Sequence, residues 1–279
     1  MRYFTASDGA RIAYRDEGEG RPLLFLHGLM AHGGFFPAQA SLAREFRLIA
    51  VDLRGHGASR AAGGAMTVRQ LASDIEELVA ALTLEEAVGI GWSLGASVLW
   101  EVLARPAGAR FAGAIVIDMT ARVQNEDGWE LGLSPEACDL RTAAIAEDFE
   151  TFATAAGQAI FAQPIGEAQR EAADWASAEF ARNDPETIGA LWRSLVASDF
   201  RPLLGRIAQP TLIVHGRYSQ LYGPPTAAYL ARALPNASAI EFASSGHALQ
   251  LEEPEAFNAV IRDFADRLSR TVLPQTQEI

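Results

Sequence analysis

The chain has 279 residues, of which 49% are hydrophobic and 21% are charged, which is the composition of an ordinary globular protein. Its formal net charge of −12 argues against nucleic acid and anionic membranes as partners, because both attract clustered lysine and arginine side chains. The single cysteine, Cys138, rules out an intramolecular disulfide, and no Cys/His metal spacing lies near it. We therefore expect no metal and no cofactor. The first 16 residues lack the apolar segment of a signal peptide, so we expect a cytoplasmic location.

Short apolar runs alternate along the chain with longer amphipathic segments. Two runs, at residues 2–5 and 11–14, flank Asp8-Gly9, which is typical of a β-hairpin. Five more runs follow at residues 23–26, 48–51, 87–90, 114–117 and 211–214. Because these five are apolar almost throughout, they are typical of parallel strands covered on both faces. A further strand at residues 239–242 and an amphipathic helix at residues 254–268 complete the pattern. The chain is thus predicted to adopt an α/β fold, with a mostly parallel central sheet flanked by helices.

Residues 119–198 interrupt this alternation. They contain no comparable apolar run, are rich in Ala, Glu and Gln, and carry scattered aromatic residues, a composition typical of helices. Since the segment lies between two expected strands, we interpret it as an inserted helical cap. Residues 1–118 and 199–279 then form the core domain.

The segment Gly91-Trp92-Ser93-Leu94-Gly95 contains the pattern Gly-x-Ser-x-Gly, which by itself is a weak signal. Here it follows an apolar run and opens a helical segment at residues 96–105. In such a strand–turn–helix the glycines allow a tight turn that exposes the serine hydroxyl. Ser93 is therefore the expected nucleophile. The alternative is a glycine-rich turn that holds an ordinary serine.

A serine hydroxyl attacks well only when a base takes its proton. His247 follows the strand expected at residues 239–242 and precedes the last helix, which puts it at the carboxyl edge of the sheet, where Ser93 also lies. We expect His247 to be this base, a loop histidine bonded to backbone being the alternative. Of the other histidines, His27 is interpreted as shaping a turn and His56 as part of a structural loop, while His215 ends a strand before Gly216.

Four segments, in this order, resemble the landmarks of the α/β-hydrolase superfamily, and the resemblance covers nearly the whole chain. They are Leu26-His27-Gly28-Leu29, Asp52-Leu53-Arg54-Gly55-His56-Gly57-Ala58-Ser59, Gly91-Trp92-Ser93-Leu94-Gly95 and Gly246-His247-Ala248. The resemblance implies the α/β-hydrolase fold and an oxyanion hole made by two backbone N–H groups. By motif position these belong to Leu29 and Leu94. Such donors stabilise the negative charge that develops on a carbonyl oxygen during the reaction.

The acid partner of the histidine departs from the commonest pattern of the superfamily. Most relatives carry an Asp three residues after the Gly that ends the seventh strand, but after Gly216 this position holds Ser219. No Asp or Glu occurs between Asp199 and Glu241. The candidate is Asp118, at the end of the sixth run, an arrangement that resembles certain dehalogenases, a zearalenone-type lactonase and cofactor-free dioxygenases. A carboxylate there can fix the tautomer of the histidine and stabilise its protonated form. A residue that caps the next turn is the alternative.

These residues predict a serine hydrolase that cleaves a small or medium, fairly apolar carboxylic ester or lactone through an acyl-enzyme on Ser93. An Asp nucleophile, as dehalogenases and epoxide hydrolases use, is absent from this motif. Further substrate contacts are expected from Trp92, His32 and Trp129, with core packing as the alternative for the two tryptophans.

Two other functions stay open at this point. The first is a cofactor-free dioxygenase or another non-hydrolytic enzyme of the same fold, in which His247 and Asp118 act as a base and Ser93 only binds. The second is a binding module that resembles a hydrolase-like hormone receptor, which an intact serine, histidine and acid disfavour. The expected partner is a small molecule, and a homodimer is compatible with the sequence.

Overall fold

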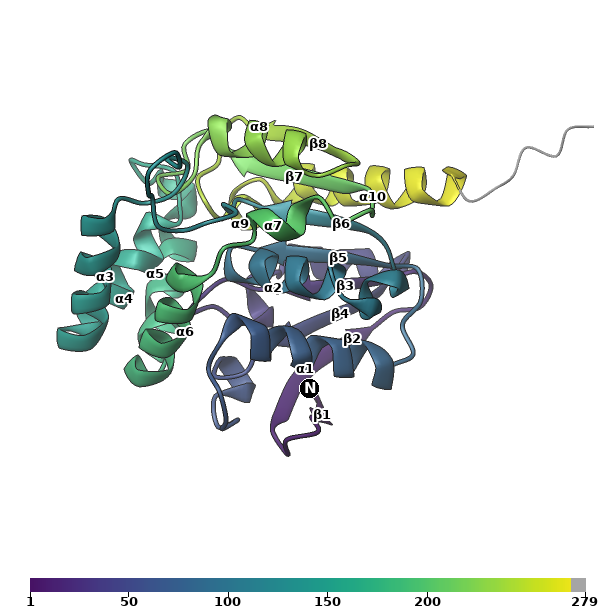
Figure 1. Cartoon of the computed structure of the whole chain (residues 1–279), viewed down its shortest axis with the longest axis horizontal. Coiled ribbons are helices and arrows are strands. Elements are labelled where there is room, and N and C mark those ends of the chain that lie inside the picture. The colour runs from purple at the N-terminus through teal and green to yellow at the C-terminus, as the bar shows by residue number, and fades with distance from the viewer. Residues whose placement is uncertain (272–279) are drawn as a thin grey trace, which may run out of the picture.

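The computed structural model describes residues 1–271, and within them eight strands form one sheet (Figure 1). The strands are β1 (Arg2–Thr5), β2 (Arg11–Glu17), β3 (Pro22–Leu26), β4 (Arg47–Asp52), β5 (Ala87–Trp92), β6 (Phe111–Ile117), β7 (Thr211–Gly216) and β8 (Ala237–Phe242). Their order is β1-β2-β4-β3-β5-β6-β7-β8. The pairs β1–β2 and β2–β4 are antiparallel, and all other pairs are parallel. The predicted mostly parallel sheet is confirmed.

Helices cover both faces of this sheet. In Figure 1, α1 (Val68–Ala81), α2 (Leu94–Leu103) and α8 (Pro224–Ala233) lie in front of the sheet, and α10 (Pro254–Thr271) lies behind it. Every residue of β3, β5 and β7 is buried, as parallel strands between two helical layers require. Shorter elements connect them: η1 (Gly33–Phe35), η2 (Ala38–Arg44), η3 (Gly57–Ser59), η4 (Pro106–Arg110), α7 (Arg201–Leu204) and α9 (Leu249–Glu252).

The stripe of apolar residues on α10 faces the sheet at β6. Phe257, Ile261, Phe264 and Leu268 are buried, at the spacing of one helical face. Gly113 of β6 makes room for this stripe, because a Cβ there would lie 2.8 Å from Leu268 Cδ1. The amphipathic pattern read from the sequence is therefore the face that packs on the sheet.

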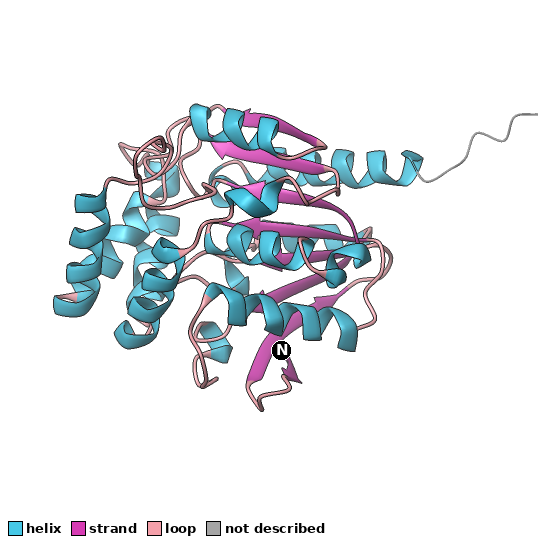
Figure 2. Cartoon of the chain, viewed as in Figure 1, coloured by secondary structure: helices cyan, strands magenta, loops and turns pink. Residues whose placement is uncertain are grey.

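Four helices are inserted between β6 and β7 (Figure 2). They are α3 (Pro135–Glu147), α4 (Phe149–Ala159), α5 (Glu167–Ala181) and α6 (Pro185–Ala197). Side chains cap three of their N-termini by accepting a backbone N–H: Ser134, Asp148 and Asp184. The four helices gather at one end of the sheet (Figure 1), so the expected helical insertion is present, with its helices between Pro135 and Ala197.

In residues 1–271, no helix is both long enough and apolar enough to cross a membrane.

Candidate active site

Ser93 occupies the sharp turn between β5 and α2. Its backbone angles are φ 53° and ψ −119°, a region that costs a residue with a side chain roughly 1–3 kcal/mol. Its N–H donates to Ile117 O at 3.0 Å, which ties the turn to the end of β6. The turn is therefore held in a strained shape by its neighbours, as in a nucleophile elbow.

Gly91 and Gly95, on either side of Ser93, leave no room for a side chain, because neighbouring backbone segments approach them closely. A Cβ on Gly95 would lie 2.1 Å from Leu26 O, and one on Gly91 would lie 2.6 Å from Ala96 Cα. A larger residue at either position would push α2 away from β3 or from β5. The spacing of the motif thus reflects the packing of this helix on the sheet.

Asp118 and His247 are in direct contact, although 129 residues separate them. His247 Nδ1 lies 2.5 Å from Asp118 Oδ2, and the two side chains are 3% and 1% exposed. With Nδ1 donating to the carboxylate, the other ring nitrogen, Nε2, is free to act as an acceptor toward the cavity that His247 lines. Asp118 itself has a φ of 43° and its N–H donates to Val214 O at 2.9 Å, so β7 holds the turn that carries it.

Ser219 stands at the position where the resemblance would place an acid, and its hydroxyl contacts Asp118. Its Oγ donates to Asp118 Oδ2 at 2.5 Å. The same Oγ lies 3.3 Å from Leu221 N and 3.4 Å from Tyr222 N, whose N–H groups donate to it. The loop after β7 thus supplies a hydroxyl that orients the carboxylate on the loop after β6. This role of Ser219 was not predicted from the sequence.

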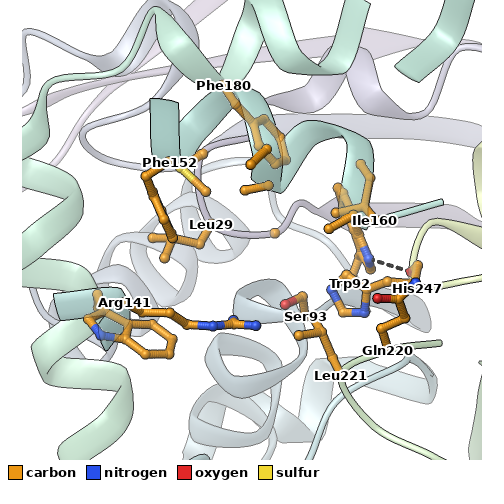
Figure 3. Close-up of a pocket in the computed structure, with 16 residues that line it drawn as sticks. Leu29, Trp92, Ser93, Arg141, Phe152, Ile160, Phe180, Gln220, Leu221 and His247 are labelled. Atoms are coloured by element: carbon orange, nitrogen blue, oxygen red, sulfur yellow. Dashed lines mark hydrogen bonds between the residues drawn. The ribbon is translucent and has the colours of Figure 1, made fainter. Parts of the chain in front are cut away.

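The loop that carries His247 is fixed by buried polar contacts. Trp92 Nε1 donates to His247 O at 2.9 Å (Figure 3), and Ala248 N donates to Ile160 O at 2.9 Å. Glu252 accepts Gly246 N and Ala162 N, both at 2.7 Å, so one carboxylate joins this loop to the insertion. Burial raises the pKa of Glu252 to about 6.

Ser93 and His247 line one cavity of about 300 Å³ between the sheet and the insertion (Figure 3). Its floor comes from Gly28, Leu29, Met30, Trp92 and Ser93, and its wall from α3 to α6 and the loop after β7. The lining is mostly apolar and includes Phe152, Ile160, Phe180, Trp192 and Leu221. A cavity of this kind accommodates a small, largely apolar ligand.

Leu29 and Leu94, predicted to donate their backbone N–H groups to an oxyanion, stand in the loop after β3 and at the start of α2. Leu94 is the first residue of α2, so its N–H is among those without a partner inside the helix. Leu29 follows Gly28 on the cavity floor, and a Cβ on Gly28 would lie 3.3 Å from Ser93 Cβ. Because of this close approach, the loop after β3 and Ser93 face the same space.

His27 shapes that loop. Its Nδ1–H donates to Gly28 O at 2.7 Å and its Nε2 accepts Leu53 N at 2.9 Å. Complete burial holds the pKa of His27 well below its ordinary value, so the ring stays neutral, as this pair of bonds requires. Burial also lowers the pKa of His56 to about 4, and its Nδ1 contacts Arg54 O at 3.1 Å. Both rings bond to loop backbone.

Two of the three expected substrate contacts lie outside this cavity. The ring of His32 caps η1 by accepting Gly34 N, and its Nε2 lies 3.2 Å from Glu179 Oε2. Trp129 is 4% exposed, donates to Arg122 O and packs edge-on against Tyr229. Trp92 lines the cavity. The turn of η1 directs His32 to α5, and core packing holds Trp129.

Several lining residues of the insertion were not singled out from the sequence, above all Arg141 and Phe152. No local motif marks them, because their direction depends on how α3 and α4 pack on the core. Within residues 1–271, no group of three or more His, Cys, Asp or Glu side chains could hold a metal ion.

The family model for the alpha/beta hydrolase family matches residues 23–260. The chain therefore belongs to the alpha/beta hydrolase family.

Relatives and solved structures include esterases and a lactonase. The pimeloyl-[acyl-carrier protein] methyl ester esterase of Nitrosospira multiformis is 30% identical over 89% of this chain and 95% of its own length. An esterase from Exiguobacterium antarcticum superimposes with a TM-score of 0.88, 25% identity and coverage of 95% and 98% of the two chains. The enol-lactonase from Burkholderia xenovorans LB400 has the same fold, with a TM-score of 0.84, 24% identity and coverage of 94% and 99%.

Proposed function

We propose that this protein is a serine hydrolase that cleaves a small or medium, fairly apolar carboxylic ester or lactone through an acyl-enzyme on Ser93. The observation that carries the proposal is the contact of His247 Nδ1 with Asp118 Oδ2, beside a serine on a strained elbow in the same cavity. Esterases among the relatives, including one named for a methyl ester, support the same reaction class.

In the proposed reaction, His247 Nε2 takes the proton of Ser93 Oγ as this oxygen attacks the carbonyl carbon of the substrate. The N–H groups of Leu29 and Leu94 stabilise the oxyanion of the tetrahedral intermediate. Asp118 stabilises the protonated imidazole, which then gives its proton to the leaving alkoxide. Water, deprotonated by His247, attacks the acyl-enzyme and releases the acid.

Residues 119–198 act as a cap in this proposal. Their helices α4 to α6 supply the apolar side chains of Phe152, Phe180 and Trp192 to the cavity wall. An apolar cover of this kind keeps bulk water from the acyl group, and the small volume favours a small substrate over a polymer.

Labelling with a fluorophosphonate, together with hydrolysis of p-nitrophenyl acetate, tests the proposal. We expect one covalent adduct, located on Ser93 by peptide mass spectrometry, and we expect Ser93→Ala to abolish both labelling and hydrolysis. The matched control is Ser97→Ala, because this buried serine lies one turn further along α2. An unlabelled Ser93 would contradict the hydrolase and favour a non-hydrolytic use of His247 and Asp118.

A further inference from the structure

The cavity beside Ser93 contains one positively charged group within an apolar lining. Among the lining residues that the structure describes, Arg141 is the one lysine or arginine. It comes from α3, and Figure 3 shows its guanidinium extending across the cavity toward Ser93. The hydrolytic reaction proposed above does not use this charge.

The Arg141 guanidinium has no anionic partner in the part of the chain that the structure describes. Other arginines of the chain pair with carboxylates, for example Arg105 with Glu76 and Arg201 with Asp199. Within residues 1–271, no hydrogen bond or ion pair engages Arg141, which lies against the Trp192 ring with its Cζ 5.8 Å from the centroid. Trp192 is itself fixed, since its Nε1 donates to Thr142 Oγ1 at 3.0 Å.

A part-buried guanidinium among apolar side chains loses hydration and gains only the weak attraction of the Trp192 ring. A carboxylate compensates for the lost hydration, because its two oxygens accept hydrogen bonds from two parallel N–H groups of arginine. The side chain is already oriented by Trp192, so little order remains to be imposed when an anion binds. The arrangement suits a ligand with an acidic end.

We propose that Arg141 binds a carboxylate of the substrate, so that the preferred substrate is an ester or lactone with a carboxylate remote from the reacting carbonyl. This inference rests on the proposed function of Ser93. The reacting carbonyl lies at Ser93, the carboxylate lies at Arg141, and the apolar chain between them contacts Leu29 and Phe152. Arg141 is a binding residue that determines specificity and takes no part in the proton transfers.

Matched pairs of methyl esters test the proposal. Monomethyl succinate, glutarate and adipate are compared with methyl butyrate, pentanoate and hexanoate, which carry a methyl group in place of the carboxylate. We expect kcat/KM to favour the half-ester by at least about tenfold at the best chain length. Arg141→Met lowers this ratio at least about tenfold, mainly through KM, and Arg141→Lys keeps part of it because the charge remains.

The matched control is Arg170→Met, which removes an equal charge from an exposed position on α5 outside the cavity and should leave the ratio unchanged. Equal kcat/KM for the two members of every pair, or an equal loss on both in Arg141→Met, overturns the role of Arg141 while the hydrolase stands. Thermal melting confirms that each variant is folded.

Failure of the proposed function is seen separately, as absence of hydrolysis of every ester by the wild-type protein. Calorimetric titration of monomethyl adipate into Ser93→Ala then decides the role of Arg141 without any turnover. We expect binding that weakens at least about tenfold in Ser93→Ala/Arg141→Met. An unchanged Kd, or no binding to Ser93→Ala, overturns the carboxylate site.

Discussion

At the candidate triad the carboxylate stands on the loop after β6, and a hydroxyl stands on the loop after β7. Asp118 follows β6 and contacts His247, while Ser219 follows β7 and donates to Asp118 Oδ2. Both loops begin at the carboxyl ends of neighbouring parallel strands, β6 and β7, so their first side chains lie close together. An acid on either loop can reach His247 Nδ1 for this reason, and the hydroxyl then serves to orient the acid.

Asp118→Asn should lower kcat by about 10³- to 10⁴-fold with little change in the fold. The amide can offer its N–H₂ to Nδ1 and so favour the wrong tautomer, and it cannot stabilise the protonated ring. The measurement is kcat on p-nitrophenyl acetate, with circular dichroism as the check on folding. Activity within about tenfold of wild type would remove Asp118 from the mechanism.

Adding Ser219→Asp to Asp118→Asn should restore at least about tenfold of the lost kcat, because the new carboxylate stands where Ser219 Oγ now contacts Asp118 at 2.5 Å. Ser238→Asp in the same background is the control, since it adds an equal charge on β8 at an exposed position. Equal activity of the two double variants would mean that the loop after β7 does not reach His247 with a carboxylate.

Single residues were predictable where a motif fixes their backbone. Ser93 and His247 belong to such segments. The absence of Asp and Glu between Asp199 and Glu241 pointed to Asp118 by elimination. Side chains whose direction depends on tertiary packing were not predictable. His32 was expected to contact the substrate from its loop, but its ring bonds to Gly34 N and Glu179 instead. That Ser93, His247 and Asp118 are the catalytic groups stays a prediction until the experiments above are done. The same holds for Leu29 and Leu94 as oxyanion donors.

At the scale of elements, the strands and the last helix were predicted within a few residues, because buried parallel strands and an amphipathic helix leave clear periodic patterns. The helices of the insertion were not delimited. α3 buries only Cys138 and Ile145, so it lacks the continuous apolar stripe that marks a helix in a sequence. The N-capping residues before α3, α4 and α6 were the sequence signal that could have marked where these helices begin.

Glu252 of α9 supplies one of the contacts that join the insertion to the His247 loop, beside the bond from Ala248 N to Ile160 O. Burial raises the pKa of this carboxyl from 4.5 to about 6. The folded protein therefore holds a proton that the unfolded chain releases between these values. The resulting contribution to stability is complete below about pH 4.5 and is lost as the pH rises through about 6.

Glu252→Gln should accordingly show a deficit in unfolding free energy that shrinks as the pH rises from 4.5 to 7. The variant cannot titrate, whereas the wild type loses its proton-linked stability over this interval. Urea unfolding at each pH measures the deficit. The control is Glu255→Gln, because Glu255 is exposed on α10, and its deficit should not follow this course. A deficit for Glu252→Gln that does not change with pH would contradict titration of the buried carboxyl.

Over the whole molecule, Arg54 joins three segments that are distant in the sequence. Its Nε and Nη2 donate to the two oxygens of Asp74 on α1 at 2.8 and 2.6 Å. Its Nη1 lies 2.8 Å from Asp8 Oδ2 in the turn between β1 and β2, and this contact lowers the pKa of Asp8. The Arg54 side chain is fully buried and that of Asp74 is 2% exposed.

Because both charges are buried, removing one should destabilise the protein more than removing both. Asp74→Leu should lower the free energy of unfolding by about 3–5 kcal/mol, since it leaves the guanidinium buried beside Asp8 alone. Arg54→Met/Asp74→Leu should lose less than Asp74→Leu, because apolar packing replaces the whole pair. Urea unfolding of the full cycle measures this coupling. Arg262→Met is the control, because its pair with Glu45 is 38% and 47% exposed and should contribute under about 1 kcal/mol. Additive losses in the cycle would mean that the pair does not act as a unit, and the hairpin, the loop after β4 and α1 would then be held together by apolar packing instead.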